Sequence, residues 1–309
     1  MLYPALDPKE TGHLPVGAGH EIYFEVCGNP EGKPALFLHG GPGGGFYADH
    51  RRLFDPQRYR IVLFDQRGCG RSRYEDRLRE NTTQHLVRDI EALREKLDVT
   101  DWHVVLGGSW GATLALTYAL THRARVKALV LRGVFSGRQS EIDWLYRFGA
   151  SQLFPQQWEA FIGGLPESKR SDALGAYYQL LMGADEMARL AAARNWCAWE
   201  GSLLTLLPRG PYASSDKHVL GLAQIETHYF VNHCFLEDGE LLRRASELEG
   251  IPGIIIQGRY DVVTPATTAH ELHQRWPGSR LEIVPDAGHA TNEPGILRKI
   301  IEATDQLAE

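Results

Sequence analysis

The sequence lacks the cysteine and charge patterns of several protein classes. Four cysteines occur in 309 residues, far apart and without a C-x-x-C pair. This spacing indicates neither a zinc site nor a disulfide framework, so we expect four free thiols. We find no signal for a metal or an organic cofactor. No block of five or six like charges is present, and 33 basic against 39 acidic residues give a net charge of −6, which argues against nucleic-acid binding.

Long apolar runs are missing as well. No run approaches the roughly 18 residues that a membrane-spanning helix needs. The first eight residues have neither the basic segment nor the apolar stretch of a signal peptide. We therefore expect a cytoplasmic protein with no membrane partner. A content of 43% hydrophobic and 23% charged residues is typical of a folded globular chain.

Glycine, by contrast, is abundant. The chain has 32 glycines in 309 residues, about 10% where proteins average about 7%. Twelve of them fall in loops expected at the C-terminal edge of a sheet, namely Gly40, Gly41, Gly43, Gly44, Gly45, Gly68, Gly70, Gly107, Gly108, Gly111, Gly258 and Gly288. We expect them to form tight turns around a site at that edge.

Short apolar segments alternate with helical ones and predict an α/β fold. Continuous apolar runs, typical of strands buried on both faces, lie at residues 35–38, 61–64, 103–106, 128–131 and 254–256, and we expect the last strand at 281–284. Residues 83–97 and 109–120 have helical patterns. This alternation predicts a mostly parallel, doubly wound sheet, and the β-rich stretch at 19–26 adds an antiparallel edge hairpin.

The middle of the chain follows a different pattern. Strand-like runs stop near residue 133 and resume near 249; the helix-like segments between them are 141–149, 171–181, 185–199 and 218–235, with a break at 208–211. We predict a helical cap domain at 134–248, inserted into a discontinuous domain formed by 1–133 and 249–309.

A serine stands between a predicted strand and a predicted helix. Residues 107–111 read GGSWG, the G-x-S-x-G pattern of a nucleophile elbow. The flanking glycines allow a strained turn that exposes the Ser109 hydroxyl at a helix N-terminus, where a developing anion is favoured. The alternative is a tight turn with a capping serine. Because the strand and the helix flank the motif, we interpret Ser109 as a nucleophile.

A serine nucleophile needs a base, and the base needs an orienting carboxylate. In chains with a nucleophile elbow, the acid and then the histidine follow the serine along the sequence. Asp261 and His289 each come directly after a predicted strand, so we predict them as the acid and the base. Asp286 is an alternative acid, but it lies too near His289 in sequence to come from a separate loop.

A glycine-rich loop at residues 39–45, HGGPGGG, also follows a predicted strand. It matches the oxyanion loop of lipases and esterases. A phosphate-binding loop is the alternative, but the Gly-Lys-Ser/Thr ending is missing and Phe46 replaces the last glycine of G-x-G-x-x-G. We predict that the backbone N–H groups of Gly41 and Trp110 hold the oxyanion.

Taken together, these motifs make the chain resemble the proline iminopeptidases, which are prolyl aminopeptidases of the α/β-hydrolase fold. The resemblance covers essentially the whole chain. It is carried by HGGPGGG at 39–45, DQRGCGRS at 65–72, GGSWG at 107–111, LRGVF at 131–135, WCAWEG at 196–201, IETHYF at 225–230 and GRYD at 258–261. The resemblance implies an α/β-hydrolase fold with a helical cap and a Ser109, Asp261 and His289 triad.

Two carboxylates in the predicted cap have apolar side chains as neighbours on their helices. Glu226 shares a helix face with Phe230, and Glu200 stands one turn after Trp196. Two buried carboxylates need a cation between them or a bound proton, and an N-terminal ammonium group supplies that cation. The resemblance implies that Glu200 and Glu226 bind the substrate amino group and that Phe135 and Phe230 line the proline pocket. The alternative is a structural acid paired with an arginine.

The chain departs from the family at two places. Leu145 stands where members carry a second tyrosine, which puts one wall of the proline pocket in doubt, and Val263 stands where some carry cysteine. Residues 65–72 have charges, but in related hydrolases this loop supports the sheet edge and the oxyanion loop, and we expect the same role.

We predict a serine aminopeptidase that releases N-terminal proline from short peptides through an acyl-enzyme, with other small N-terminal residues as alternative substrates. We expect a monomer or small homo-oligomer. The alternatives are an esterase, lactonase or amidase with the same triad, and a binding protein of this fold that has lost turnover.

Overall fold

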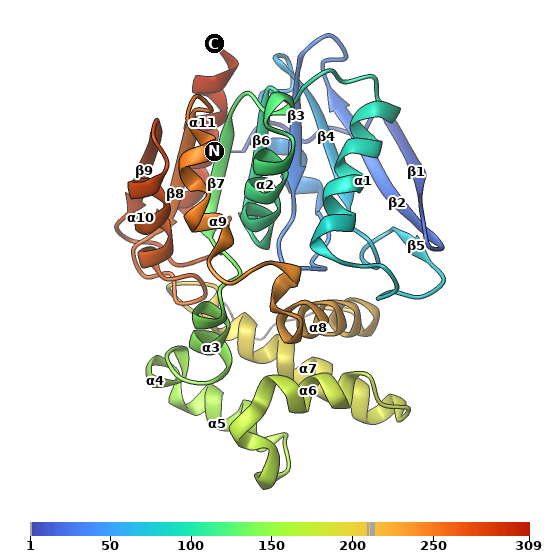
Figure 1. The fold of residues 1–309 in the computed structure, drawn as a ribbon, viewed down its shortest axis with the longest axis vertical. Helices are drawn as coiled ribbons and strands as arrows, with labels where there is room; N and C mark the ends of the chain where they lie inside the picture. Colours follow the sequence, from blue (N-terminus) through green and yellow to red (C-terminus); the bar gives the residue numbers. More distant parts are fainter. Residues whose placement is uncertain (1, 209, 211–213) are drawn as a thin grey trace.

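The computed structural model describes residues 2–208, 210 and 214–309. Its strands are β1 Glu10–Gly17, β2 His20–Gly28, β3 Lys33–Leu38, β4 Tyr59–Asp65, β5 Arg73–Tyr74, β6 Val104–Ser109, β7 Leu129–Val134, β8 Gly253–Gly258 and β9 Ser279–Val284. Within the described residues they form one sheet in the order β1-β2-β4-β3-β6-β7-β8-β9, with β5 beside β2 (Figure 1). The pairings from β4 to β9 are parallel, whereas β1–β2, β2–β4 and β2–β5 are antiparallel. The predicted α/β fold with a mostly parallel sheet is confirmed.

Both faces of the sheet are covered, which explains why its strands read as continuous apolar runs. Along β3, Leu36 belongs to the core on one face, whereas Phe37 belongs to the core on the other. The first face packs against α1 Thr83–Lys96, α2 Trp110–Thr121 and α10 Ala266–Arg275. The second packs against the short helix η1 Ala48–Leu53 and against α11 Pro294–Ala308.

Local signals set the start and the face of α1. The Thr82 side chain accepts a hydrogen bond from the backbone N–H of His85 at 3.4 Å, which caps the helix. Leu86, Ile90 and Leu93 are buried on the side that faces the sheet. The predicted helix at 83–97 therefore agrees with the structure to within one residue.

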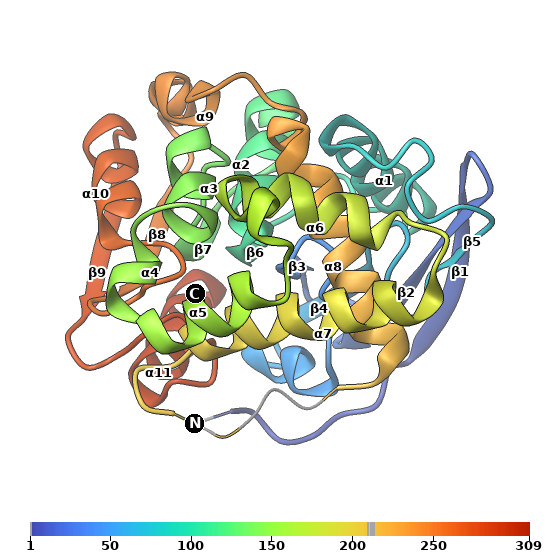
Figure 2. The ribbon, with the colours of Figure 1, turned by 90° about the horizontal axis from the view of Figure 1, so that it is seen from below.

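The segment between β7 and β8 is helical. Its elements are α3 Gln139–Tyr146, α4 Ala150–Leu153, α5 Pro155–Gly163, η3 Glu167–Asp172, α6 Ala173–Leu181, α7 Glu186–Leu203, α8 Asp216–Val231, η4 His233–Phe235, α9 Glu240–Arg243 and η5 Ala245–Leu248. Helices α3 to α8 lie across the edge of the sheet at which β7 ends (Figures 1 and 2). Helix α9 and η5 instead contact α2 and α10. The domain boundaries at 133–134 and 248–249 stay a prediction.

Three predicted helix ends in this segment differ from the structure by three or more residues. The predicted helix at 141–149 ends earlier, at Tyr146. Helix α7 continues to Leu203, four residues beyond the predicted end at 199. The predicted helix at 218–235 stops at Val231, because Cys234 has a φ of 54°, which an α-helix cannot contain. Of the predicted break at 208–211, residues 209 and 211 lie outside the described residues.

Candidate active site

Ser109 stands at the sharp turn between β6 and α2. Its φ of 58° and ψ of −125° are rare for a residue with a side chain. The turn requires its glycines. A Cβ on Gly107 would lie 2.2 Å from the carbonyl oxygen of Gly111, and a Cβ on Gly111 would lie 2.1 Å from that of Leu38. The strand, the strained serine and the close backbone contacts have the form expected of a nucleophile elbow.

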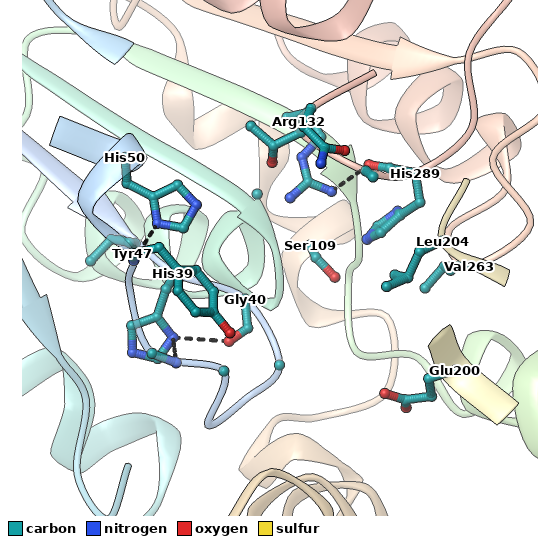
Figure 3. Close-up of a pocket in the computed structure, with 18 of the residues that line it drawn as sticks. His39, Gly40, Tyr47, His50, Ser109, Arg132, Glu200, Leu204, Val263 and His289 are labelled. Atoms are coloured by element: carbon teal, nitrogen blue, oxygen red, sulfur yellow. Dashed lines mark hydrogen bonds between the residues drawn. The ribbon is translucent and has the colours of Figure 1, made fainter. Parts of the chain in front are cut away.

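Asp261 and His289 are brought together by the loops after β8 and β9. The Nδ1 atom of His289 lies 2.8 Å from Oδ2 of Asp261, and both side chains are buried. The alternative acid, Asp286, is exposed. Burial lowers the pKa of His289 below its ordinary 6.5, although the Asp261 carboxylate acts in the opposite direction. His289 is therefore neutral near pH 7 and can accept a proton. Figure 3 shows its ring turned toward Ser109.

The Asp261 carboxylate is fixed by groups that the sequence did not reveal. The backbone N–H of Thr264 donates to Oδ1 at 2.8 Å, and the Thr264 hydroxyl donates to Oδ2 at 3.0 Å. The Nε2 amide of Gln257 donates to the same oxygen at 3.1 Å. Thr264 is only three residues from Asp261, so a turn closed by the aspartate side chain was the signal available in the sequence.

The glycine-rich loop at 39–45 lies against the elbow. A Cβ on Gly40 would come 3.3 Å from Cβ of Ser109. Gln66 ties the loop to α2, because its Nε2 amide donates to the His39 carbonyl at 3.0 Å and its Oε1 accepts from the Trp110 indole at 3.0 Å. Gln66 lies in the 65–72 segment, so these contacts fit the supporting role expected there.

A cavity of about 500 Å³ joins these residues to the helical segment. Ser109 and His289 line it together with the predicted oxyanion and substrate residues Gly41, Glu200, Glu226, Phe135 and Phe230. Leu145, the position of the missing tyrosine, and Val263 line it as well. The cavity thus contains side chains from the sheet loops and from α7 and α8.

Glu200 and Glu226 meet inside this cavity. The two carboxyl groups are close enough to influence each other's pKa, and Glu226 is only 3% exposed. The indole N–H of Trp196 donates to Oε2 of Glu226 at 2.7 Å, and the Tyr146 hydroxyl donates to Glu200. Among the described residues neither carboxylate forms a salt bridge, so the alternative of an acid paired with an arginine finds no support.

Burial raises the pKa of both carboxyl groups. For Glu226 the neighbouring Glu200 carboxylate adds to the effect and places the pKa well above its ordinary value. The pair therefore holds a proton in a range where exposed carboxyl groups have lost theirs. A cation placed against the pair would displace that proton.

Aromatic rings surround the carboxylates. Phe135 and Phe230 meet edge to face with their centroids 6.0 Å apart. Tyr146 stacks on Trp196 at 4.4 Å and lies 5.6 Å from Phe230. Tyr146 and Trp196 were missed as site residues, although both stood beside singled-out positions, Leu145 and Glu200. The contact between Tyr146 and Glu200 joins positions 54 residues apart in the sequence, so no local sequence pattern predicts it.

Arg132, on β7, is a further cavity residue that the sequence did not single out. Its Nη1 donates to the backbone carbonyl of His289 at 2.8 Å, and a Cβ on Gly108 would strike its guanidinium at 2.4 Å. Burial lowers the pKa of Arg132 to about 10, so that it stays charged near pH 7. It supports the histidine loop from beneath the elbow.

The four cysteines are buried and unpaired, and burial raises the pKa of Cys69 well above its ordinary value. In the described ranges no three histidine, cysteine, aspartate or glutamate side chains are grouped as metal ligands. None of the described helices combines the length and the hydropathy needed to cross a membrane.

Comparisons with known proteins match nearly the whole chain. A family model described as the alpha/beta hydrolase fold matches residues 33–295. The probable proline iminopeptidase of Leptolyngbya boryana is 48% identical over 310 residues, which cover 99% of this chain and 96% of the relative. The proline iminopeptidase of Xylella fastidiosa (strain Temecula1) is 48% identical and covers 98% of both chains. A crystal structure of a proline iminopeptidase from Mycobacterium smegmatis matches with a TM-score of 0.61 at 21% identity, covering 97% of this chain and 99% of that one, and so shows the fold alone.

Proposed function

The chain belongs to the proline iminopeptidase family of the α/β-hydrolase fold, and on this premise we propose that Ser109, His289 and Asp261 release N-terminal proline from peptides. The enzyme is a hydrolase of peptide bonds. We take its substrates to be short peptides, because helices α3 to α8 cover the edge of the sheet on which the cavity opens.

The carboxylate pair inside the cavity is the observation that carries the proposal. Glu200 and Glu226 share the cavity of Ser109 and form no salt bridge among the described residues. A protonated prolyl nitrogen placed between them replaces the bound proton with a fixed positive charge. Phe135 and Phe230 offer the ring an apolar surface on the same side. The bound substrate therefore presents its first carbonyl carbon to Ser109.

Acylation follows from the residues around that carbon. The Ser109 oxygen attacks, and Nε2 of His289 takes the hydroxyl proton. Negative charge develops on the carbonyl oxygen, where the N–H groups of Gly41 and Trp110 are its proposed donors. His289 then protonates the leaving amine, the C–N bond breaks, and a prolyl ester of Ser109 remains.

Deacylation repeats these steps with water. His289 removes a proton from a water molecule, which attacks the ester carbonyl and regenerates the Ser109 hydroxyl as proline leaves. Asp261 holds the imidazole through its 2.8 Å contact with Nδ1 and stabilises the imidazolium in both halves of the reaction.

An active-site label tests the nucleophile directly. A fluorophosphonate probe should label the wild-type protein at one serine and should not label Ser109→Ala, because the reagent reacts only with a serine activated by its base. Ser202→Ala, which changes a half-buried serine of α7, is the matched control and should label fully. Labelling that persists in Ser109→Ala would refute the assignment, and wild-type protein that resists the probe would favour a binding protein.

An esterase, lactonase or amidase would use the same triad but would leave both carboxylates without a cation. The ratio of prolyl-amide to uncharged-ester hydrolysis separates these functions, because only the first substrate carries an ammonium group.

A further inference from the structure

The cavity extends past Ser109, away from the carboxylate pair. This second part, here called the distal lobe, is formed by residues far apart in the sequence, namely Leu2, Phe37, His50, Leu53, Leu297 and Ile300. They come from the N-terminal segment, β3, η1 and α11 and not from the helices that cover the sheet edge. Figure 3 shows Ser109 between Glu200 on one side and His50 on the other.

The distal lobe is apolar. Phe37, Leu53 and Ile300 belong to the core cluster on this face of the sheet, and Leu2 and Leu297 pack against that cluster. The remaining member, His50, stacks on Phe37 with ring centroids 4.4 Å apart. Its surroundings make a protonated ring costly, since burial lowers its pKa to about 3. At neutral pH the lobe therefore presents carbon atoms and one neutral ring.

Two charged side chains near the lobe, Asp49 and Arg132, have their interaction partners outside it. Asp49 also lines the cavity, but it is exposed and pairs with Arg52 at 2.7 Å. Arg132 lies beneath the elbow and donates from Nη1 to the His289 carbonyl, whereas its buried Nε has no hydrogen-bond partner among the described residues. Neither charge has its partner inside the apolar lobe. A charged or polar side chain placed there would thus lose its water without a fixed partner.

The position of the lobe relative to the reacting groups suggests its occupant. If the carboxylates hold the prolyl ammonium group, the first residue of the substrate lies on their side of Ser109. The leaving amine must then lie next to His289, which protonates it. Residues 290–292 continue the cavity wall from His289 to the start of α11 at Pro294. The chain after the scissile bond is therefore directed toward the distal lobe.

We propose that the distal lobe binds the side chain of the residue that follows the scissile bond and selects peptides in which this residue is large and apolar. The proposal rests on the function proposed above. A cavity of about 500 Å³ is in the range that encloses ligands larger than a single proline residue. The lobe thus gives the enzyme a second recognition site besides the ammonium clamp.

Dipeptide amides test the proposal, because they keep a terminal carboxylate out of the cavity. We expect kcat/KM for Pro-Leu-NH2 and Pro-Phe-NH2 to exceed that for Pro-Gly-NH2 by about tenfold or more, as burial of several carbon atoms predicts. Pro-Asn-NH2 has nearly the shape of the leucine amide but should be no better than the glycine amide. Equal kcat/KM for all four amides would overturn the proposal while leaving the proposed function intact. If none of the prolyl amides is cleaved, the proposed function fails and the lobe assignment fails with it.

A pair of variants on one helix locates the effect. Leu297→Asn makes the lobe polar and should lower kcat/KM for Pro-Leu-NH2 much more than kcat/KM for Pro-Gly-NH2, so that most of the preference for leucine over glycine is lost. Leu307→Asn is the control, since Leu307 is also half-buried on α11 and packs on the same core but does not line the cavity. It should keep the preference. An equal loss in both variants would show that the effect comes from α11 stability, and would overturn the assignment of the lobe.

Discussion

Glu200 and Glu226, the proposed binding site of the substrate amino group, illustrate how such a site can destabilise the protein that carries it. Two interacting carboxyl groups, of which Glu226 is buried and Glu200 half-buried, lie among aromatic rings without a salt bridge among the described residues. Burial and mutual repulsion disfavour their ionised forms. The arrangement becomes favourable when an ammonium group binds between them. The same two carboxyl groups would then both select a free amino terminus and lower the stability of the substrate-free protein.

Neutral replacements of either carboxylate should weaken binding of the amine selectively. In Glu200→Gln and Glu226→Gln we expect KM for prolyl 2-naphthylamide to rise about tenfold or more, because the ammonium group loses a buried charge partner. KM for p-nitrophenyl acetate, which has no amine, should stay near the wild-type value. Steady-state kinetics with both substrates measure these two changes in KM. Similar increases for the two substrates would contradict the ammonium clamp.

The same pair predicts that the stability of the wild-type protein decreases as pH rises. In the unfolded chain Glu226 ionises near its ordinary pKa of 4.5, but in the folded protein its pKa is well above that value. Between these two pKa values the folded state holds a proton that the unfolded state has lost, so the free energy of unfolding falls as pH rises. Glu226→Gln cannot lose this proton and should escape the decrease.

We therefore expect the Tm of Glu226→Gln to exceed that of wild type by a margin that grows from pH 5 to pH 8. The shift should be about 2–4 °C for each kcal/mol. Thermal unfolding monitored by circular dichroism at several pH values measures it. Glu159→Gln, at an exposed position on helix α5, is the control and should give no such trend. A Glu226→Gln variant that is less stable than wild type at pH 8 would contradict the explanation.

The turn from β6 to α2 shows why its glycines cannot be exchanged. Gly111→Ala would place a methyl group 2.1 Å from the Leu38 carbonyl oxygen, which belongs to the backbone of a central strand. We expect a loss of about 1–3 kcal/mol or more in the free energy of unfolding, measured with urea, together with most of the activity. Gly163→Ala, at the end of α5, meets no atom within 4 Å and should be neutral or slightly stabilising. Equal effects of the two changes would contradict this explanation of the motif.

The elements differ in how well the sequence predicts them. The parallel strands were predicted closely, because burial on both faces leaves an apolar run such as 254–256 within β8. Helix α11 was not predicted, since it begins with Pro294 and Gly295, which resemble a turn. Among site residues, Ser109 and His289 lie in local motifs after strands. Tyr146, in contrast, is brought to Glu200 only by the packing of two helices.

At the scale of the whole molecule, different layers supply different parts of the proposed site. Loops at one edge of the sheet supply Ser109, Asp261 and His289, and helices α7 and α8 supply the two carboxylates. The face with η1 and α11 supplies the distal lobe. A substrate that spans the cavity would contact all three parts. The position of the scissile bond would then be set by the amino terminus of the peptide, which explains an enzyme that removes one residue at a time.

A single pair of substrates tests most directly whether the two carboxylates bind the substrate amino group. The measurement is kcat/KM of the wild-type enzyme for prolyl 2-naphthylamide and for N-acetylprolyl 2-naphthylamide, which differ only at the amine. The carboxylate clamp predicts that the blocked substrate is cleaved at least about a hundredfold less efficiently, because a buried carboxylate is left without its cation. Equal efficiency for the two substrates, or faster cleavage of the blocked one, would contradict the assignment of an aminopeptidase and favour an amidase or esterase.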